Sequence, residues 1–227
     1  MKFDTICVQG AHNPAENRNT PPVPIYQTTA FSFDNVQYAA DLFDLKANGD
    51  IYTRLSNPTT NTLEERLAML EGGVGALAVS SGQSASLIAI LNIAKSGDEV
   101  VASTNMYGGT VNLLNVTLNK MGIKTHFVSS DNAEDFEAQV TDKTRCIFVE
   151  MLNNPSLKIA DVENIALVAH KHNIPLIVDN TIPSPYLCRP IEFGADIVVH
   201  SLTKYICGHG TSMGGVIIDS GNFDWVK

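Results

Sequence analysis

Lys204 is the residue whose type and setting point most directly to chemistry. It stands in Ser201-Leu202-Thr203-Lys204-Tyr205, among small and apolar residues. Lysine is rarely buried without a partner, and burial lowers the pKa of its ammonium group toward that of a nucleophilic amine. Such an amine condenses with an aldehyde to give an imine. Ser201 and Thr203 stand at alternate positions just before Lys204, so both hydroxyls can face one phosphate. A surface lysine on a loop is the alternative.

Two other segments suit a charged ring or a phosphate. Asp179 ends the apolar run 174–179. A carboxylate there can hold a protonated pyridine nitrogen and so make the ring an electron sink, although helix caps and metal ligands also use Asp at strand ends. Residues 80–85 are Ser-Ser-Gly-Gln-Ser-Ala and lead into a predicted helix, whose free N–H groups suit a phosphate. Alternatively, Gly82 only turns the chain and Ser81 only caps the helix.

Aromatic and imidazole side chains add to this set. Tyr107, followed by two glycines, can lay its ring over another flat ring, and an ordinary core tyrosine is the alternative. His200 and His209 flank Lys204, and we interpret them as supporting polar groups. The sequence has no Walker loop, dinucleotide glycine fingerprint, zinc-ligand spacing or serine-hydrolase elbow.

The elements that must position these residues begin at about residue 59, where apolar runs alternate with amphipathic helices. Strands that are nearly all apolar, each followed by a helix, indicate a parallel or mostly parallel sheet covered on both faces. Ligands bind such sheets at the carboxyl ends of the strands, and polar residues follow five of the predicted strands. We predict strands over 76–80, 99–103, 124–128, 145–150, 176–179, 196–200 and 215–219, and helices ending at Gly72 and over 84–95, 110–121, 132–140 and 161–172.

The first 60 residues have weak periodicity and many turn formers. They predict an extended N-terminal arm with a short helix near 36–46. Such an arm rarely packs only on its own domain, so we expect it to reach a neighbouring subunit. The expected domains are therefore an arm over 1–60 and one sheet-based domain over 61–227.

Composition narrows the class of protein. Fifteen Lys and Arg against 24 Asp and Glu give a net charge of −9, so nucleic acid and anionic membrane surfaces are not expected partners. No stretch is long and apolar enough to span a bilayer, and the first ten residues lack a secretory pattern. The four cysteines form no C-x-x-C pair. Reduced thiols in a cytoplasmic protein are therefore expected, with no metal site.

In combination, these segments resemble the Cys/Met-metabolism family of pyridoxal-5′-phosphate (PLP) enzymes, within the aspartate-aminotransferase-like (fold type I) group. The resemblance covers essentially the whole chain, with several motifs in the right order and spacing. It implies an α/β fold: a PLP-dependent transferase large domain with a mostly parallel mixed sheet covered by helices and an extended N-terminal arm. The matching segments are 24–31 (Pro-Ile-Tyr-Gln-Thr-Thr-Ala-Phe), Tyr52-Thr53-Arg54, Asn57-Pro58-Thr59, Ser81-Gly82-Gln83, Asn154-Pro155, Asp179-Asn180-Thr181 and 200–205 (His-Ser-Leu-Thr-Lys-Tyr).

The resemblance also implies a role for each matching residue. Lys204 forms the Schiff base with PLP and later carries protons. Asp179 pairs with the pyridine nitrogen, and Tyr107 stacks on the ring and serves as an acid or base toward the substrate. Asn154 lies beside the ring hydroxyl. The remaining implied contacts are Gly82, Gln83, Ser201 and Thr203 on the phosphate, and Tyr52 and Arg54 reaching the neighbouring subunit's site in a homotetramer of active dimers.

Members of the family differ in what they do at the γ-carbon of an amino-acid substrate. Gln83 and the ending 219–225 resemble members that replace the acetate of O-acetylhomoserine with sulfide to give homocysteine. In that reaction the freed Lys204 amine removes the α-proton, acetate leaves the γ-carbon and sulfide takes its place. A cystathionine γ-synthase or methionine γ-lyase type of reaction is the alternative.

The sequence also departs from the family pattern. Asn153 replaces a small residue of many members, and Cys207 stands where a small residue, often glycine, is usual. Family members are much longer, and the C-terminal domain that supplies an arginine for the substrate carboxylate is expected to be absent here. A truncated, non-catalytic PLP-binding or assembly module is therefore the alternative of another class. A nucleotide-binding Rossmann protein fits least, because the glycine fingerprint is missing.

Overall fold

The computed structural model describes residues 1–226 and divides the chain into two compact units. The first unit is Met1–Arg66, and the second begins at Leu67. Within the described residues, no helix is long and apolar enough to cross a membrane.

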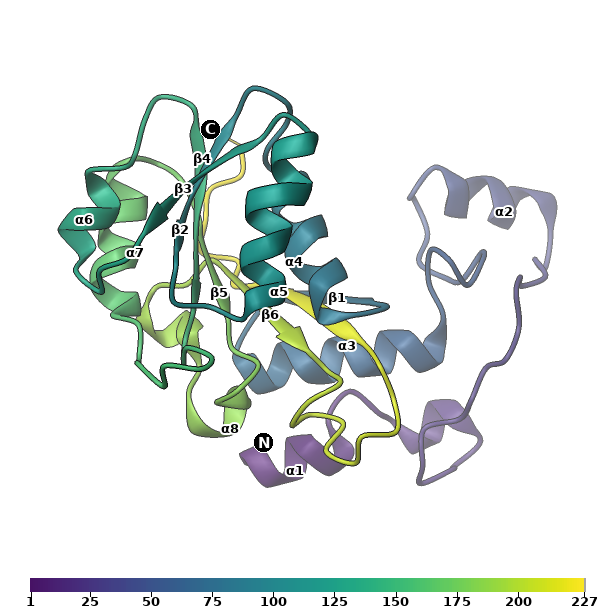
Figure 1. Ribbon diagram of the computed structural model, residues 1–227. Coiled ribbons are helices and arrows are strands. Elements are labelled where there is room, and N and C mark those ends of the chain that lie inside the picture. The colour runs from purple at the N-terminus through teal and green to yellow at the C-terminus, as the bar shows by residue number, and fades with distance from the viewer. Residues whose placement is uncertain (227) are drawn as a thin grey trace. The chain divides into compact units, whose positions relative to one another are not determined.

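The second unit is built on one seven-stranded mixed sheet in the order β1-β7-β6-β5-β4-β2-β3 (Figure 1). β7 runs antiparallel to both of its neighbours, β1 and β6, and every other neighbouring pair is parallel. The predicted fold class, α/β with a mostly parallel mixed sheet, is confirmed. The strands are β1 (Gly75–Val79), β2 (Glu99–Ser103), β3 (Lys124–Val128), β4 (Thr144–Glu150), β5 (Leu176–Asp179), β6 (Ile197–Ser201) and β7 (Gly215–Asp219).

Helices cover both faces of this sheet, which is why its strands are nearly all apolar. Figure 1 shows α4 and α5 on one face and α6 and α7 on the other. The helices of this unit are α4 (Gly82–Leu91), α5 (Gly108–Asn112), α6 (Ala133–Glu137), α7 (Val162–Lys171) and α8 (Ser184–Leu187), with a π-helical stretch at Leu113–Leu118 and a 3₁₀ turn at Pro190–Phe193.

The core lies between the sheet and the layer formed by α4 and the π-helical stretch. Ala85 and Ile90 of α4 are fully buried, as is Leu114, and they pack in one cluster with Phe148 and Ile177 of the central strands. Burying one side chain of the size of leucine, isoleucine or phenylalanine stabilises the folded state by about 1.5–3 kcal/mol. The central strands are therefore held firmly, and the loops at their ends start from fixed points.

The first unit is mostly irregular chain joined by polar contacts. Ala30 and Tyr52 form an isolated antiparallel bridge. The buried Asn57 side chain donates to the Tyr26 carbonyl at 2.9 Å and to Thr53 Oγ1 at 3.1 Å. This unit contains α1 (Phe3–Gln9), a 3₁₀ turn (Pro14–Asn17), α2 (Val36–Phe43) and the greater part of α3 (Pro58–Glu71).

Several element boundaries differ from the sequence-based prediction. The expected helix over 110–121 starts as α5 at Gly108 and continues as a π-helical stretch, so it is not one regular helix. α4 begins at Gly82 rather than residue 84, because the Ser81 hydroxyl caps it by accepting from the Ser84 N–H. The short helices α1 and α8 were not predicted, because four to seven residues carry too little periodicity.

Candidate active site

A cavity of about 300 Å³ opens at the carboxyl ends of β4, β5 and β6. This volume lies at the lower end of the range of ligand pockets. Every predicted site residue of the second unit lines it. The lining residues are Ser81, Gly82, Gln83, Tyr107, Thr110, Glu150, Leu152, Asn154, Asp179, Thr181, Ile182, Ser201, Thr203, Lys204 and Met213.

Lys204 lies in the turn that follows β6. Its backbone N–H donates to the Ser201 carbonyl at 3.2 Å, and its own carbonyl accepts from the Gly208 N–H at 2.8 Å. These bonds fix the turn while the side chain faces the cavity. Its ammonium group makes no hydrogen bond or ion pair with residues 1–226. The small and apolar neighbours in the sequence suggested a buried lysine, whereas the structure shows an exposed one. The amine is therefore available to a ligand in the cavity.

The N-terminus of α4 forms one wall. The N–H groups of Gly82 and Gln83 belong to the first turn, where a helix has no internal acceptor for them. Two glycines allow the close approach of this turn to the strands. A Cβ on Gly82 would lie 2.6 Å from Ser201 Cβ, and a Cβ on Gly215 would lie 2.8 Å from the Gly82 nitrogen. The turn and β6 thus present N–H groups and hydroxyls to the same space.

Asp179 ends β5, as predicted, and Thr181 holds its carboxylate. The Thr181 hydroxyl and N–H both donate to Oδ1 of Asp179, at 2.5 and 3.0 Å, and the Ser201 N–H donates to the same hydroxyl at 2.8 Å. Burial raises the pKa of Asp179, whereas the Thr181 donors and nearby His200 lower it. Among residues 1–226, no group donates to the other oxygen, Oδ2. A cation at that oxygen would stabilise the carboxylate.

A buried polar cluster supports the loops after β5 and β6. His200 Nε2 lies 2.6 Å from Oε1 of Glu71, and the same oxygen accepts from the Asn180 side chain at 2.8 Å. All three side chains are buried. The prediction that His200 is a supporting group agrees with this contact, whereas Glu71 was missed because its sequence position near the end of α3 carries no signal of the pairing.

Tyr107 and Asn154 lie on loops that follow β2 and β4. Tyr107 is half exposed, and a Cβ on Gly109 would meet its ring, so the glycine leaves room for that ring. Glu150 accepts hydrogen bonds from the backbone N–H groups of both Tyr107 and Asn154. Glu150 and Thr181 are the main site residues that sequence analysis did not assign; each stands at or just after a strand end, which is the signal that could have identified them.

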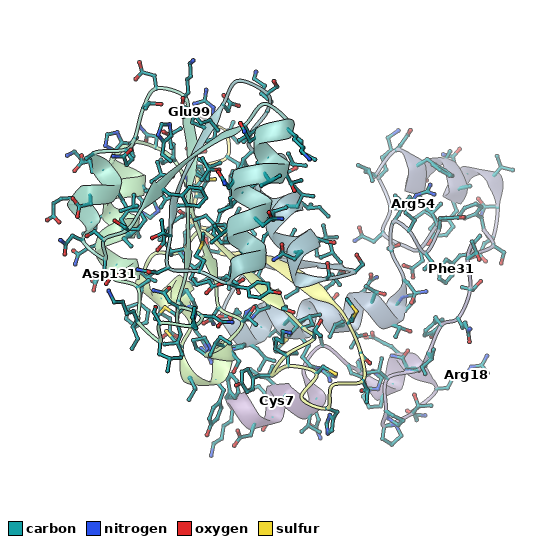
Figure 2. All side chains as sticks on the ribbon, viewed as in Figure 1. Cys7, Arg18, Phe31, Arg54, Glu99 and Asp131 are labelled. Carbon is teal, nitrogen blue, oxygen red and sulfur yellow. The ribbon has the colours of Figure 1, made fainter. Side chains whose placement is uncertain are left out.

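Tyr52 and Arg54 belong to the first unit and do not line this cavity. The Arg54 guanidinium, labelled in Figure 2, lies 4.8 Å from the centroid of the Tyr52 ring. Their predicted contact with a neighbouring subunit's site stays a prediction. Within the described residues, no cluster of His, Cys, Asp and Glu could hold a metal ion.

The donor set of the cavity fits PLP. The Lys204 amine can react with the aldehyde of PLP. The Asp179 oxygen that accepts no hydrogen bond can pair with the basic ring nitrogen, and the N–H groups at the start of α4 can bind the phosphate. A sequence profile of the family described as "Cys/Met metabolism PLP-dependent enzyme" matches residues 4–227.

The chain belongs to this family.

Individual relatives agree with the assignment. The chain is 52% identical over 225 residues to the O-acetyl-L-homoserine sulfhydrylase of Leptospira meyeri, covering 99% of this chain and 51% of that protein. It is 47% identical to the homocysteine/cysteine synthase of Saccharomyces cerevisiae, covering 98% of this chain and 51% of that one. The chain therefore spans about half the length of the curated relatives it matches.

Solved structures show the same fold. The crystal structure of a Campylobacter jejuni protein described as an O-acetylhomoserine (thiol)-lyase superposes with a TM-score of 0.95 at 42% identity, covering 98% of this chain and 55% of that one, and contains N′-pyridoxyl-lysine-5′-monophosphate. Cystathionine gamma-lyase from Lactobacillus plantarum superposes with a TM-score of 0.89 at 31% identity, covering 97% and 55%. The fold thus carries more than one named reaction.

Proposed function

We propose that the whole protein is a PLP-dependent transferase that replaces the acetate of O-acetylhomoserine with sulfide and yields homocysteine. The observation that carries the proposal is the meeting of the Lys204 amine, the Asp179 carboxylate and the start of α4 in one cavity. The names of the relatives from Leptospira meyeri and Saccharomyces cerevisiae support the reaction type. The four cysteines are free, which agrees with a cytoplasmic location.

Each wall of the cavity has a proposed task. Asp179 Oδ2 would hold the ring nitrogen in its protonated form, and Thr181 fixes the orientation of that carboxylate. PLP, when bound, supplies the electron sink that stabilises negative charge at the substrate α-carbon. Tyr107 would contact the ring, and Asn154 would contact the ring hydroxyl. The phosphate contacts are the N–H groups of Gly82 and Gln83 and the hydroxyls of Ser201 and Thr203.

Lys204 is the proposed base. Its Nζ takes the α-proton of the amino-acid substrate and later returns a proton to the same carbon. The exposed position of the side chain lets Nζ move between the cofactor and the substrate. Once Nζ has given up the first proton, it takes a second one from the β-carbon, and acetate leaves the γ-carbon. Sulfide then adds at the γ-carbon as HS⁻, and Nζ returns a proton to the β-carbon before the α-carbon is protonated.

The reaction type is tested by supplying the full-length protein with two substrate pairs and with methionine alone. O-acetylhomoserine with sulfide should give homocysteine at the highest kcat/KM. O-acetylhomoserine with cysteine would give cystathionine, and methionine alone would give methanethiol by γ-elimination. A preference for either of the last two would replace the sulfhydrylase proposal while leaving the family assignment intact. A holoprotein inactive on all three would support the non-catalytic module instead.

We propose in addition that Tyr52 and Arg54 complete the site of a neighbouring subunit in a homotetramer of active dimers. The resemblance of Tyr52-Thr53-Arg54 to the corresponding segment of the family supports this assignment. Arg54→Ala and Lys204→Ala subunits, each inactive alone, should regain activity when mixed before oligomers form. Random pairing leaves about a quarter of the sites with both native residues. Mixed oligomers without recovered activity would place Arg54 in its own subunit's site.

A further inference from the structure

Two loops bring the proposed ring contacts to the cavity from different strands. Tyr107 lies on the loop after β2, and Asn154 lies on the loop after β4. β2 and β4 are neighbours in the sheet. The separation of the two side chains therefore depends on what joins these two loops beyond the ends of the strands.

Glu150 joins them directly. It is the last residue of β4 and is only 6% exposed. Its Oε1 accepts from the Tyr107 N–H at 2.8 Å, and its Oε2 accepts from the Asn154 N–H at 3.1 Å. Its register partner on β5 is Asp179, the proposed partner of the ring nitrogen. One carboxylate thus lies beside three proposed cofactor contacts.

Asn153 adds a second link between the same loops. Its side chain is 3% exposed. In the amide orientation that satisfies its neighbours, the Asn153 side-chain nitrogen donates to the Asn105 carbonyl at 2.7 Å and to the Glu150 carbonyl at 3.1 Å. Asn105 lies two residues before Tyr107. A small residue at position 153 could not reach either carbonyl, so this link depends on the asparagine.

We propose that Glu150 is a positioning residue for the proposed reaction, holding Tyr107 and Asn154 at a fixed separation across the cofactor ring, with Asn153 reinforcing it. The inference rests on the proposed function. A carboxylate suits this task because each of its oxygens accepts hydrogen bonds, whereas an amide of the same shape has only one accepting oxygen. Glutamine would leave one buried N–H facing an NH₂ group.

Backbone N–H groups donate to both oxygens of Glu150, which suits a carboxylate that orients two loops. Burial raises the pKa of Glu150 to about 7, Asp179 adds to the rise, and the two N–H donors lower it. Above this pKa the buried charge costs free energy, and the two N–H donors offset part of that cost.

The test is Glu150→Gln in the full-length protein, with Glu99→Gln as the matched control. Glu99 is a partly buried carboxylate whose Oε2 lies near two side-chain groups, Thr141 Oγ1 at 2.7 Å and His126 Nε2 at 2.9 Å. It begins β2, so it lies at the opposite end of the strands from the cavity; Figure 2 labels it and Asp131, which follows β3. The control replaces a carboxylate by its amide without touching the two loops.

The readouts are the visible circular dichroism of bound PLP, which reports how firmly the ring is oriented, and kcat and KM measured separately. Glu150→Gln should lose most of the dichroic band and roughly ten- to hundredfold in kcat, since a small misplacement at the reacting centre has effects of this size. The unfolding temperatures of both variants are measured as well, so that a loss of global stability is distinguished from a loss of ring orientation. Asn153→Ser should change the same readouts in the same direction, but less.

An unchanged dichroic band and kcat in Glu150→Gln would overturn the inference, as would equal loss in Glu99→Gln. If Glu150→Gln does not fold, Asn153→Ser decides the question by the same two readouts. Failure of the proposed function has a different signature, because the wild-type protein would then lack the PLP band or fail to make homocysteine.

Discussion

Replacing Gly215 with alanine should weaken PLP binding through the phosphate alone. Gly215 begins β7 and pairs with Val79 on one side and Ser201 on the other. An added Cβ would lie 2.8 Å from the Gly82 nitrogen and closer still to the Ser81 carbonyl. Ordinary contacts of carbon with heavy atoms are about 3.5 Å, and the Ser81 carbonyl oxygen is the nearest atom, so the turn before α4 must move by more than about 1 Å.

The size of the effect follows from this displacement. Overpacking by one methyl group in a tight site costs about 1–3 kcal/mol. If that cost falls on the bound form, the Kd for PLP rises roughly five- to hundredfold. Pyridoxal, which lacks the phosphate, should bind the variant and the wild type equally well, because the Lys204 and Asp179 contacts are unchanged.

The assay is titration of the apoprotein with PLP and with pyridoxal, followed by the visible absorbance of the bound form. Gly75→Ala is the matched control, because it is also a strand glycine and an added Cβ there meets nothing within 4 Å. Unchanged PLP affinity in Gly215→Ala would refute the placement of the phosphate at the start of α4. Equal losses for PLP and pyridoxal would show general disruption instead.

Three further predictions follow from the geometry. Thr181→Val removes the hydroxyl donor to Asp179 and should weaken PLP binding about tenfold, measured by absorbance titration; an unchanged Kd would contradict the role of the hydroxyl. Burial raises the pKa of Glu150 from 4.5 to about 7, so the folded state binds this proton more tightly and stability falls as pH rises across that interval. The fall is worth roughly 3 kcal/mol and should be absent from the pH profile of Glu150→Gln in urea unfolding. Hydrogen bonds lower the pKa of Cys207 to about 7, and burial raises the pKa of Cys146 to about 12. Iodoacetamide at pH 7 should therefore label Cys207 in the native protein and Cys146 only after unfolding. Peptide mass spectrometry locates the label, and labelling of Cys146 before Cys207 would contradict the prediction.

The sheet could be predicted because its strands are short apolar runs bounded by polar residues. The stretch ending at Asp179 is an example: buried on both faces, it has no polar position until the strand ends. The direction of β7 could not be predicted, because local pattern does not distinguish a parallel strand from an antiparallel one. That direction matters, because it places Gly215, the first residue of β7, beside the last residues of β1 and β6.

The candidate site was predicted where a residue's type and strand-end position coincide, as for Lys204 and Asp179. The residues that orient these side chains or their loops were not predicted, because the two partners of each contact are distant in sequence. Glu71 and His200 are 129 positions apart, and Tyr107 and Glu150 are 43 apart. No periodicity or motif encodes such pairs, which arise only when the strands are ordered in the sheet.

Borohydride reduction of the purified full-length protein tests the central claim most directly. The native protein should absorb at the edge of the visible range, lose that band on reduction and yield one pyridoxyl-modified peptide containing Lys204, while Lys204→Ala should yield none. A modified peptide containing another lysine, or a protein that stays colourless with added PLP, would contradict the assignment of Lys204 and with it the proposed mechanism.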